Sequence, residues 1–357
     1  MKEFHITPAE SGQRLDKYLK KLLPEAASSF LYKMLRKKNI TVNGRKADGS
    51  VIIADGDKIT LYLSDETFEK FHSRPSFSLP ETEHKNPLPA LQVLYENADI
   101  LIVNKPSGLL SQKASASDIS ANELVIRYLL ESGAITQESL ETFRPSVCNR
   151  LDRNTSGILL AGKTLHGLQE LSRQLKERSI AKYYRCIVKG SLEQPQHLKA
   201  YLEKDTGKNK SSIFRHEQPG QQNPGTWLIE TEYRPVKQYA GFTVLEVHLI
   251  TGRSHQIRAH LASIGHPVIG DAKYGDAALN RRLRDAAGLK HQLLHACRIV
   301  FPDGLEIQAP LPELFAACEA CLNPAATDKT KAKHPGRTST CRHGTRADCA
   351  ARPWKNT

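Results

Sequence analysis

The 357-residue chain lacks a long apolar run. None of its stretches stays apolar over the roughly 20 residues that a membrane-spanning helix needs. The first residues, MKEFH, do not contain the apolar segment of a secretory signal. The seven cysteines are odd in number and indicate no disulfide framework in a chain of this length. These absences predict a cytoplasmic protein with reduced thiols and no membrane partner.

Motifs for nucleotides and metals are also missing. The sequence has no glycine-rich phosphate loop and no dinucleotide fingerprint. His255 and His260 are five residues apart, whereas a spacing of four would place both on one helical face. The C-terminal ligand types are Cys318, Cys321, Cys341, His343 and Cys349. Their spacing fits no compact zinc ribbon, and the first two belong to an amphipathic helical pattern. We therefore expect no metal and no cofactor.

Positive charge is abundant, and it is concentrated at both ends of the chain. The net charge is +13. Residues 1–63 hold 12 Lys and Arg against 7 Asp and Glu, residues 323–357 hold 8 against 2, and the middle carries only +2. Basic ends of this kind favour polyanions such as RNA. The alternative is that the end charges serve solubility alone.

The first 63 residues have the pattern of a small α+β module. Residues 15–22 and 30–38 show helical spacing, with Ser28 or Ser29 as the expected cap of the second helix. Strands are expected at 40–45, which ends in an Asn-Gly turn, and at 58–63. This order resembles the S-four-like RNA-binding module of ribosomal proteins. The resemblance implies that the second helix and the nearby loop contact structured RNA. The cations concerned are Lys33, Arg36, Lys37, Lys38 and Arg45. The alternative is an ordinary mini-domain with a solvated basic face.

The rest of the chain divides into three parts. Residues 64–90 are polar, contain four prolines and are expected to form a linker. Residues 91–322 combine β-rich segments with helical patterns in irregular alternation, which argues against a doubly wound parallel fold. We predict an α+β domain with a mixed, mainly antiparallel central sheet. Residues 323–357 have the composition of a basic, disordered tail.

The most informative stretch is residues 149–157, NRLDRNTSG, followed by the apolar run ILLAG. Asp152 lies between Arg150 and Arg153, and nearby positive charge favours the ionised form of a carboxylate. Such an aspartate serves as a nucleophile or a base. The motif resembles the catalytic motif of the pseudouridine synthases that act on large-subunit ribosomal RNA (the RluA-type family). There the aspartate is essential, and the motif begins with His where this chain has Asn149. The alternative is a solvated surface cluster.

Four further segments resemble the same family, in the same order along the chain. They are VNKPSG at 103–108, KYYRCIVKG at 182–190, TGRSHQIRAH at 251–260 and GHPVIGDAKYG at 265–275. The first segment places Lys105 near the cleft, where we expect it to contact RNA. The second implies that Tyr184 stacks on the target base, with Tyr183 as the adjacent alternative on the other face of the strand.

The third segment implies that Arg253, at the start of a helix, pairs with the catalytic aspartate. Gln256, Arg258 and His260 are weaker candidates for contacts with substrate or phosphate. The leucine of the segment that follows the fourth motif, Leu294, is expected to lie beside the base and exclude water. Arg150 is expected to set the electrostatics of the motif or to contact phosphate.

The chain is thus identified as a member of the pseudouridine synthase family, with a pseudouridine synthase fold. The resemblance implies a monomer that isomerises uridine in 23S rRNA or in a large-subunit assembly intermediate. Whether Asp152 adds to the sugar or removes a proton stays open. One competing hypothesis is an RNA-binding assembly factor with a degenerate catalytic body, which would have lost Asp152, Tyr184 or Arg253. Another is a different substrate, such as transfer RNA.

Overall fold

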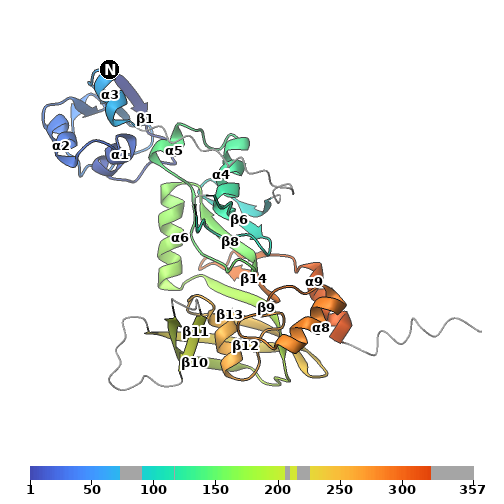
Figure 1. Ribbon diagram of the computed structural model, residues 1–357. Helices are drawn as coiled ribbons and strands as arrows, with labels where there is room; N and C mark the ends of the chain where they lie inside the picture. The colour runs from blue at the N-terminus through green and yellow to red at the C-terminus, as the bar shows by residue number, and fades with distance from the viewer. Residues whose placement is uncertain (73–90, 116, 206–209, 215–225, 323–357) are drawn as a thin grey trace, which may run out of the picture.

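The computed structural model describes residues 1–72, 91–115, 117–205, 210–214 and 226–322. Within these ranges the chain forms a four-stranded sheet and an eleven-stranded sheet (Figure 1). Each sheet has an apolar core of its own. We call residues 1–72 the N-terminal unit and the described residues of 91–322 the catalytic unit.

The N-terminal unit is a small α+β fold. Its elements are β1 (Lys2–His5), α1 (Leu15–Leu22), α2 (Ser28–Arg36), β2 (Ile40–Val42), β3 (Arg45–Lys46), β4 (Lys58–Leu61) and α3 (Asp65–Phe71). The strands are antiparallel in the order β1-β4-β2-β3. Asn43 and Gly44 have φ of 50° and 72°, the left-handed values that a two-residue hairpin turn between β2 and β3 requires. The predicted pair of helices and the Asn-Gly turn are confirmed.

Two local expectations for this unit were wrong. Helix α2 begins at Ser28, and the preceding Ala27 makes no side-chain cap. The range predicted as a linker, 64–90, begins with helix α3, whose Phe68 is 3% exposed and packs into the core of the N-terminal unit. The apolar pair Phe68 and Phe71 holds this helix to the unit, so the unit extends to residue 72. The remainder of the predicted linker and the predicted basic tail lie outside the described residues.

The large sheet confirms a mixed, mainly antiparallel architecture. Its strands are β5 (Gln92–Glu96), β6 (Ile100–Lys105), β7 (Ser146–Val147), β8 (Ser156–Gly162), β9 (Ala181–Lys189), β10 (Gln196–Asp205), β11 (Lys210–Phe214), β12 (Thr226–Tyr239), β13 (Phe242–Leu249), β14 (Leu294–Val300) and β15 (Glu306–Gln308). Nine of them follow the order β11-β10-β12-β13-β9-β14-β8-β6-β5, while β15 pairs with β14 and β7 with β8. Only the pair of β14 and β8 is parallel among the described strands.

Helices cover this sheet and complete the core. They are α4 (Ala121–Glu131), α5 (Ser139–Thr142), α6 (Leu165–Glu177), α7 (Gln256–Ser263), α8 (Ala277–Ala287) and α9 (Glu313–Leu322). In Figure 1, β6, β8, α4 and α6 form the part nearer the N-terminal unit, and β10, β12 and β13 form the part farther away. Strands β9 and β14 lie between them. Strand β8 is buried along its whole length, which explains its uninterrupted apolar sequence.

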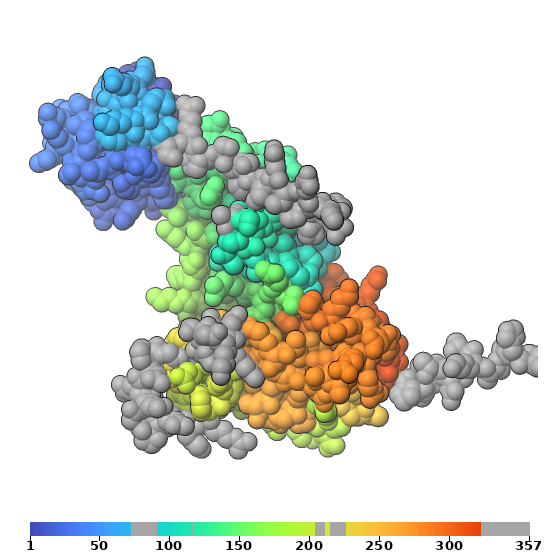
Figure 2. Space-filling model, viewed as in Figure 1, coloured from blue at the N-terminus to red at the C-terminus, as the bar shows by residue number. Residues whose placement is uncertain are grey.

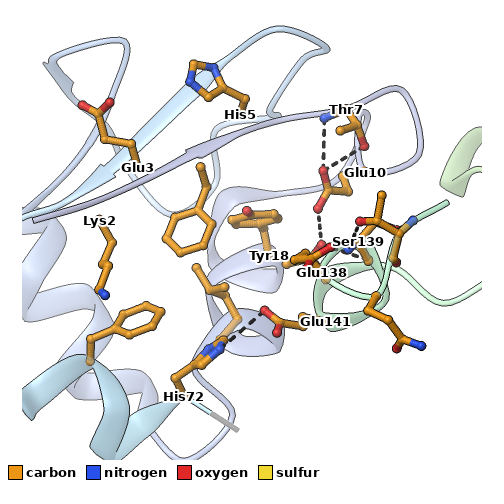
Figure 3. Close-up of a pocket in the computed structure, with 16 residues that line it drawn as sticks. Lys2, Glu3, His5, Thr7, Glu10, Tyr18, His72, Glu138, Ser139 and Glu141 are labelled. Atoms are coloured by element: carbon orange, nitrogen blue, oxygen red, sulfur yellow. Dashed lines mark hydrogen bonds and ion pairs between the residues drawn. The ribbon is translucent and has the colours of Figure 1, made fainter. Parts of the chain in front are cut away.

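The N-terminal unit projects as a lobe from one end of the molecule (Figure 2). It contacts the catalytic unit through a hydrogen bond from Thr142 to Glu10 and a contact of 3.5 Å between His72 Nε2 and the carboxylate of Glu141. A cavity of about 820 Å³ lies at this contact (Figure 3). We call it the junction cavity. Its acidic lining residues are Glu3, Glu10, Glu138 and Glu141, and Lys2 is the only Lys or Arg among the described residues that line it.

Candidate active site

Asp152 lies in the loop between β7 and β8. The amide of Thr155 donates to the carbonyl of Asp152 at 3.0 Å, which closes a turn just before β8. Gly157 then adopts φ of 112°, and a Cβ there would lie 2.2 Å from the carbonyl oxygen of Ala296 on β14. Only glycine permits so close an approach of two backbones. The glycine of the motif therefore lets β8 pair with β14, and Asp152 and Leu294 line the same cleft.

Asn149 occupies the position where the family motif usually has histidine. Its Oδ1 accepts a hydrogen bond from the amide of Leu160 at 2.8 Å, and its Nδ2 donates to the carbonyl of Ile158 at 3.4 Å. Both partners belong to β8. The amide side chain thus ties the start of the loop that carries Asp152 to the strand.

The backbone on both sides of Asp152 is fixed by the last residue of β6 and by the segment that follows that strand. Ser111 Oγ donates to the carbonyl of Leu151 and accepts from its amide, each at 2.9 Å. Lys105 Nζ donates to the carbonyl of Arg153 at 3.0 Å. With residues 151 and 153 both held, the carboxylate between them has little freedom to move. A fixed carboxylate is what chemistry on a bound base requires.

Lys105 is therefore not the RNA contact that the sequence predicted. It is 0% exposed, and its ammonium group also donates to the carbonyls of Pro106 and Leu109. Burial lowers the pKa of Lys105 to about 7, although the negative charge of Asp152 acts in the opposite direction. All three of its N–H donors are used by carbonyls, so it holds the loops rather than reaching a phosphate.

The arginine that pairs with Asp152 is Arg258, not Arg253. Arg258 Nη1 donates to Asp152 Oδ2 at 2.8 Å. Helix α7 begins at Gln256, three residues later than expected, so its first turn carries Arg258 toward the aspartate. Arg253 lies in the turn before the helix, is exposed, and stacks over the ring of Trp227. The resemblance implied the first arginine of the segment, Arg253, whereas the structure places the second one, Arg258, at Asp152.

Asp271 is a functional residue to which sequence reasoning gave no role. Arg258 Nε and Nη2 donate to its two carboxylate oxygens at 2.6 and 2.9 Å. Asp271 is fully buried, and burial would raise its pKa, but the hydrogen bonds and charge of Arg258 outweigh this and lower it. A bidentate pair of this kind fixes the plane of the guanidinium. The available signal was the aspartate of the segment GHPVIGDAKYG, of which it is the seventh residue.

Tyr184 and Leu294 line the cleft together with Asp152. They lie on the adjacent strands β9 and β14 and are 6% and 5% exposed. Burial raises the pKa of Tyr184, and the charge of Asp152 raises it further, so the phenol stays protonated. Tyr183 points to the other face, where His248 stacks on its ring at 4.8 Å and Arg298 at 3.7 Å. This placement favours Tyr184 over Tyr183 for base stacking, a role that stays a prediction.

Gln256 and His260 stabilise the fold through hydrogen bonds and do not bind the substrate. Gln256 Nε2 donates to Thr231 Oγ1 and to the carbonyl of Glu230, and its Oε1 accepts from Thr251. His260 is 2% exposed, and its Nδ1 lies 3.0 Å from Thr231 Oγ1. Burial lowers the pKa of His260 to about 4, so it is neutral at physiological pH. Both side chains pin α7 to β12 and were wrongly proposed as substrate contacts.

The cleft around Asp152 has a volume of about 1220 Å³. The Lys and Arg residues that line it are Lys113, Arg150, Arg153, Lys176, Arg178, Lys182, Arg253 and Arg258. Asp152 is the only carboxylate among its described lining residues. Arg150 is exposed, as a contact with RNA phosphate requires. A broad cavity with many cations and one acid is suited to a polyanionic substrate and to chemistry at one carboxylate.

Other predicted sites can be placed only in part. The basic residues Lys33, Arg36, Lys37, Lys38 and Arg45 are all exposed.

In the described ranges, three or more His, Cys, Asp or Glu residues nowhere gather as metal ligands would. Cys318 is buried and Cys321 exposed, and the other C-terminal ligand types lie outside these ranges. Within them, no helix combines the length and apolarity needed to cross a membrane.

Comparison with known proteins agrees with this geometry. The profile of the RNA pseudouridylate synthase family matches residues 99–263. Ribosomal large subunit pseudouridine synthase C of Escherichia coli K12 is 31% identical over 333 residues, which cover 88% of this chain and 94% of that protein. The Vibrio cholerae protein of the same name is 32% identical over 316 residues, 84% of this chain and 90% of its own.

Two solved human structures share the fold. Human RNA Pseudouridylate Synthase Domain Containing 4 superposes with a TM-score of 0.52 and 18% identity, over 65% of this chain and 92% of its own. Human RNA Pseudouridylate Synthase Domain Containing 1 gives a TM-score of 0.50 and 21% identity, over 71% of this chain and 100% of its own. With the identity to the bacterial enzymes over most of its length, this chain belongs to the RNA pseudouridylate synthase family.

Proposed function

We propose that this pseudouridine synthase modifies uridines of 23S rRNA, either free or in a large-subunit assembly intermediate. One observation carries the proposal: Asp152 is the only carboxylate in the described lining of a large basic cleft, and it is held there by Arg258. The names of the bacterial relatives support the large ribosomal subunit as the source of the RNA.

The reaction breaks the bond between the uracil nitrogen and ribose, rotates the base and rejoins it through ring carbon 5. The target base has to leave its stack to reach Asp152. Tyr184 supplies a flat, protonated ring beneath the extruded uracil, and Leu294 excludes water beside it. Arg258 bonds to Oδ2, so Oδ1 has no hydrogen-bond donor among the described residues and is available to the sugar. Both addition to the sugar and removal of its proton fit this arrangement.

The N-terminal unit is proposed to bind structured RNA as an S-four-like module. Support comes from its two helices followed by the β2–β3 hairpin and from the exposed cations on and after α2. In this proposal the N-terminal unit binds the RNA, and residues 91–322 catalyse the reaction. All proposed catalytic groups come from one chain, which supports action as a monomer, and rRNA as substrate supports a cytoplasmic location.

Two other functions were considered. An assembly factor with a degenerate catalytic body would not need to preserve the clamped loop and the buried Arg258–Asp271 pair around Asp152. Transfer RNA as substrate is consistent with the same cleft chemistry. The identity to large-subunit enzymes over nearly their whole length favours rRNA.

Mapping pseudouridine in cellular RNA with and without this gene tests the proposal. We expect specific marks in 23S rRNA to vanish on deletion and to return with the wild-type gene but not with Asp152→Asn. Marks that return equally with Asp152→Asn would support the assembly-factor hypothesis. Marks lost only from transfer RNA would correct the substrate.

A further inference from the structure

A tryptophan and an arginine meet at the rim of the catalytic cleft. Trp227 is the second residue of β12 and shares a face of that strand with Ile229 and Thr231, which are both 0% exposed. Unlike them, Trp227 is partly exposed and lines the cleft. Beneath it lies a small apolar cluster that includes Leu202 and Ile229. One side of the indole is therefore supported by protein, and the rest faces the cavity.

Arg253 lies over this ring. Its guanidinium carbon is 4.8 Å from the centre of the indole, within the range of a cation–π contact. The backbone of Arg253 is fixed because its amide donates to Gln256 Oε1 at 3.0 Å, and Gln256 is buried against β12. Arg253 forms no ion pair within the described parts of the chain, and its side chain is exposed to the cleft. The guanidinium is thus placed over an aromatic ring at the rim of the cleft, on an exposed side chain.

An enzyme that extrudes a base leaves the neighbouring base without a stacking partner on one side. Bases stack on aromatic rings and on the planes of arginine guanidinium groups. Tyr184 is already committed to the target uracil in the proposed mechanism. Trp227 with Arg253 is a second planar surface in the same cavity, and the chemistry at Asp152 does not use it.

We propose that Trp227 and Arg253 form a stacking shelf for a nucleobase next to the target uridine. The inference rests on the proposed function and adds a substrate-positioning site to it. Trp227 holds the guanidinium flat, and the neighbouring base stacks on the outer face of that guanidinium. Every base has a flat face, so the shelf contributes affinity without reading the base identity. It holds the strand in the cleft while the uridine is extruded.

The test uses an RNA fragment that contains a mapped target uridine, and versions in which either neighbouring nucleotide is abasic. In the wild type, one abasic version should bind about 5- to 150-fold more weakly, the range that corresponds to one stacked base. Trp227→Ala and Arg253→Lys should each weaken binding of intact RNA similarly. In both variants the abasic change should then have no further effect. The rate at saturating RNA should stay within about 3-fold of wild type, because the shelf acts on binding.

Three variants separate stacking from charge and from effects on folding. Arg253→Lys keeps the positive charge, so a wild-type affinity in that variant would overturn the shelf in favour of a phosphate contact. Trp227→Phe keeps an aromatic face and should retain most of the affinity. Tyr183→Ala removes the ring that stacks with Arg298 on the sheet face away from the cleft, and the abasic effect should persist there.

The inference is overturned if the abasic effect is undiminished in Trp227→Ala, or if neither neighbouring base contributes to wild-type binding. Failure of the proposed function has a different signature. In that case the wild-type enzyme forms no pseudouridine in the intact fragment.

Discussion

Two cavities lined by described residues, the catalytic cleft and the junction cavity, differ in charge. Among the described residues, the catalytic cleft is lined by eight Lys and Arg against one carboxylate. The junction cavity is lined by four glutamates against one lysine. Both contain aromatic rings and both lie between parts of the chain that are distant in sequence. Shape therefore does not tell them apart, whereas the sign of the charge does. An RNA phosphate backbone is attracted by the first cavity and repelled by the second.

The carboxylates of the two cavities are also held differently. In the cleft, Arg258 bridges Asp152 and the fully buried Asp271 with three hydrogen bonds. At the junction, Glu141 meets His72 at 3.5 Å, and Glu10 meets Thr142. The first arrangement fixes one carboxylate for chemistry. The second joins two folded units, as Figure 3 shows for Glu10 and Glu141.

The largest expected difference between the two cavities is in the stability lost when the Arg258–Asp271 pair or the His72–Glu141 pair is broken. Arg258→Met leaves Asp271 buried without its partner, which should lower the free energy of unfolding by about 3–5 kcal/mol. Glu141→Gln breaks the pair with His72, and its cost should stay within about 1 kcal/mol because Glu141 is partly exposed. Urea unfolding of both variants measures this difference. Equal losses would mean that the cleft pair is no more important to the fold than the junction pair.

A second variant separates folding from chemistry. Adding Asp271→Asn to Arg258→Met removes the uncompensated charge and should recover part of the lost stability. Pseudouridine formation should stay lost, because nothing then orients Asp152. Recovered activity in the double variant would contradict the role assigned to Arg258.

The difference in charge predicts an intermediate effect on RNA binding. Arg150→Ala removes one exposed cation of the cleft, so the slope of log affinity against log salt should become shallower by about 0.7–0.9. Glu141→Gln, in the junction cavity, should leave that slope unchanged. Fluorescence anisotropy with labelled RNA over a salt series provides the measurement. A change of slope with Glu141→Gln and none with Arg150→Ala would reverse the assignment of the two cavities.

The smallest expected effect is on how the stability of the protein changes at acid pH. Burial holds the pKa of His260 at about 4, below the ordinary value of 6.5. The unfolded chain therefore takes up the proton first, so this contribution to stability is complete above pH 6.5 and is lost as pH falls through 4. His260→Gln should make unfolding less sensitive to acid between pH 6.5 and 4, as urea midpoints would report. The matched control is His5→Gln in the junction cavity, and an equal change there would contradict the prediction.

Much of the fold followed from sequence because its signals are local. The helix at residues 15–22, the Asn43-Gly44 turn and the apolar strand after the catalytic loop all depend on neighbouring residues. Strand β8 is buried on both faces, and its unbroken apolar run indicated as much. The helix α3 was missed because only two aromatic residues, Phe68 and Phe71, attach it to the core.

The site was predicted less completely because its contacts join distant segments. The family resemblance pointed to Arg253, but Arg258, in the first turn of α7, is the arginine that reaches Asp152. Lys105 was expected near the cleft as a contact for RNA, whereas it is 0% exposed. Its burial becomes evident only once the loops at 106–109 and 153 place three carbonyls around it. The role of Asp271 likewise required the packing of α7 against its loop.

The most direct test measures the chemistry that is assigned to Asp152. RNA labelled with tritium at carbon 5 of uracil releases the label when that carbon is rejoined to ribose. Under single-turnover conditions, purified wild-type enzyme should release tritium, and Asp152→Asn should do so at least about 10³-fold more slowly while binding RNA equally well. Release by Asp152→Asn at the wild-type rate would contradict the central claim that this carboxylate, fixed by Arg258 in the basic cleft, performs the reaction.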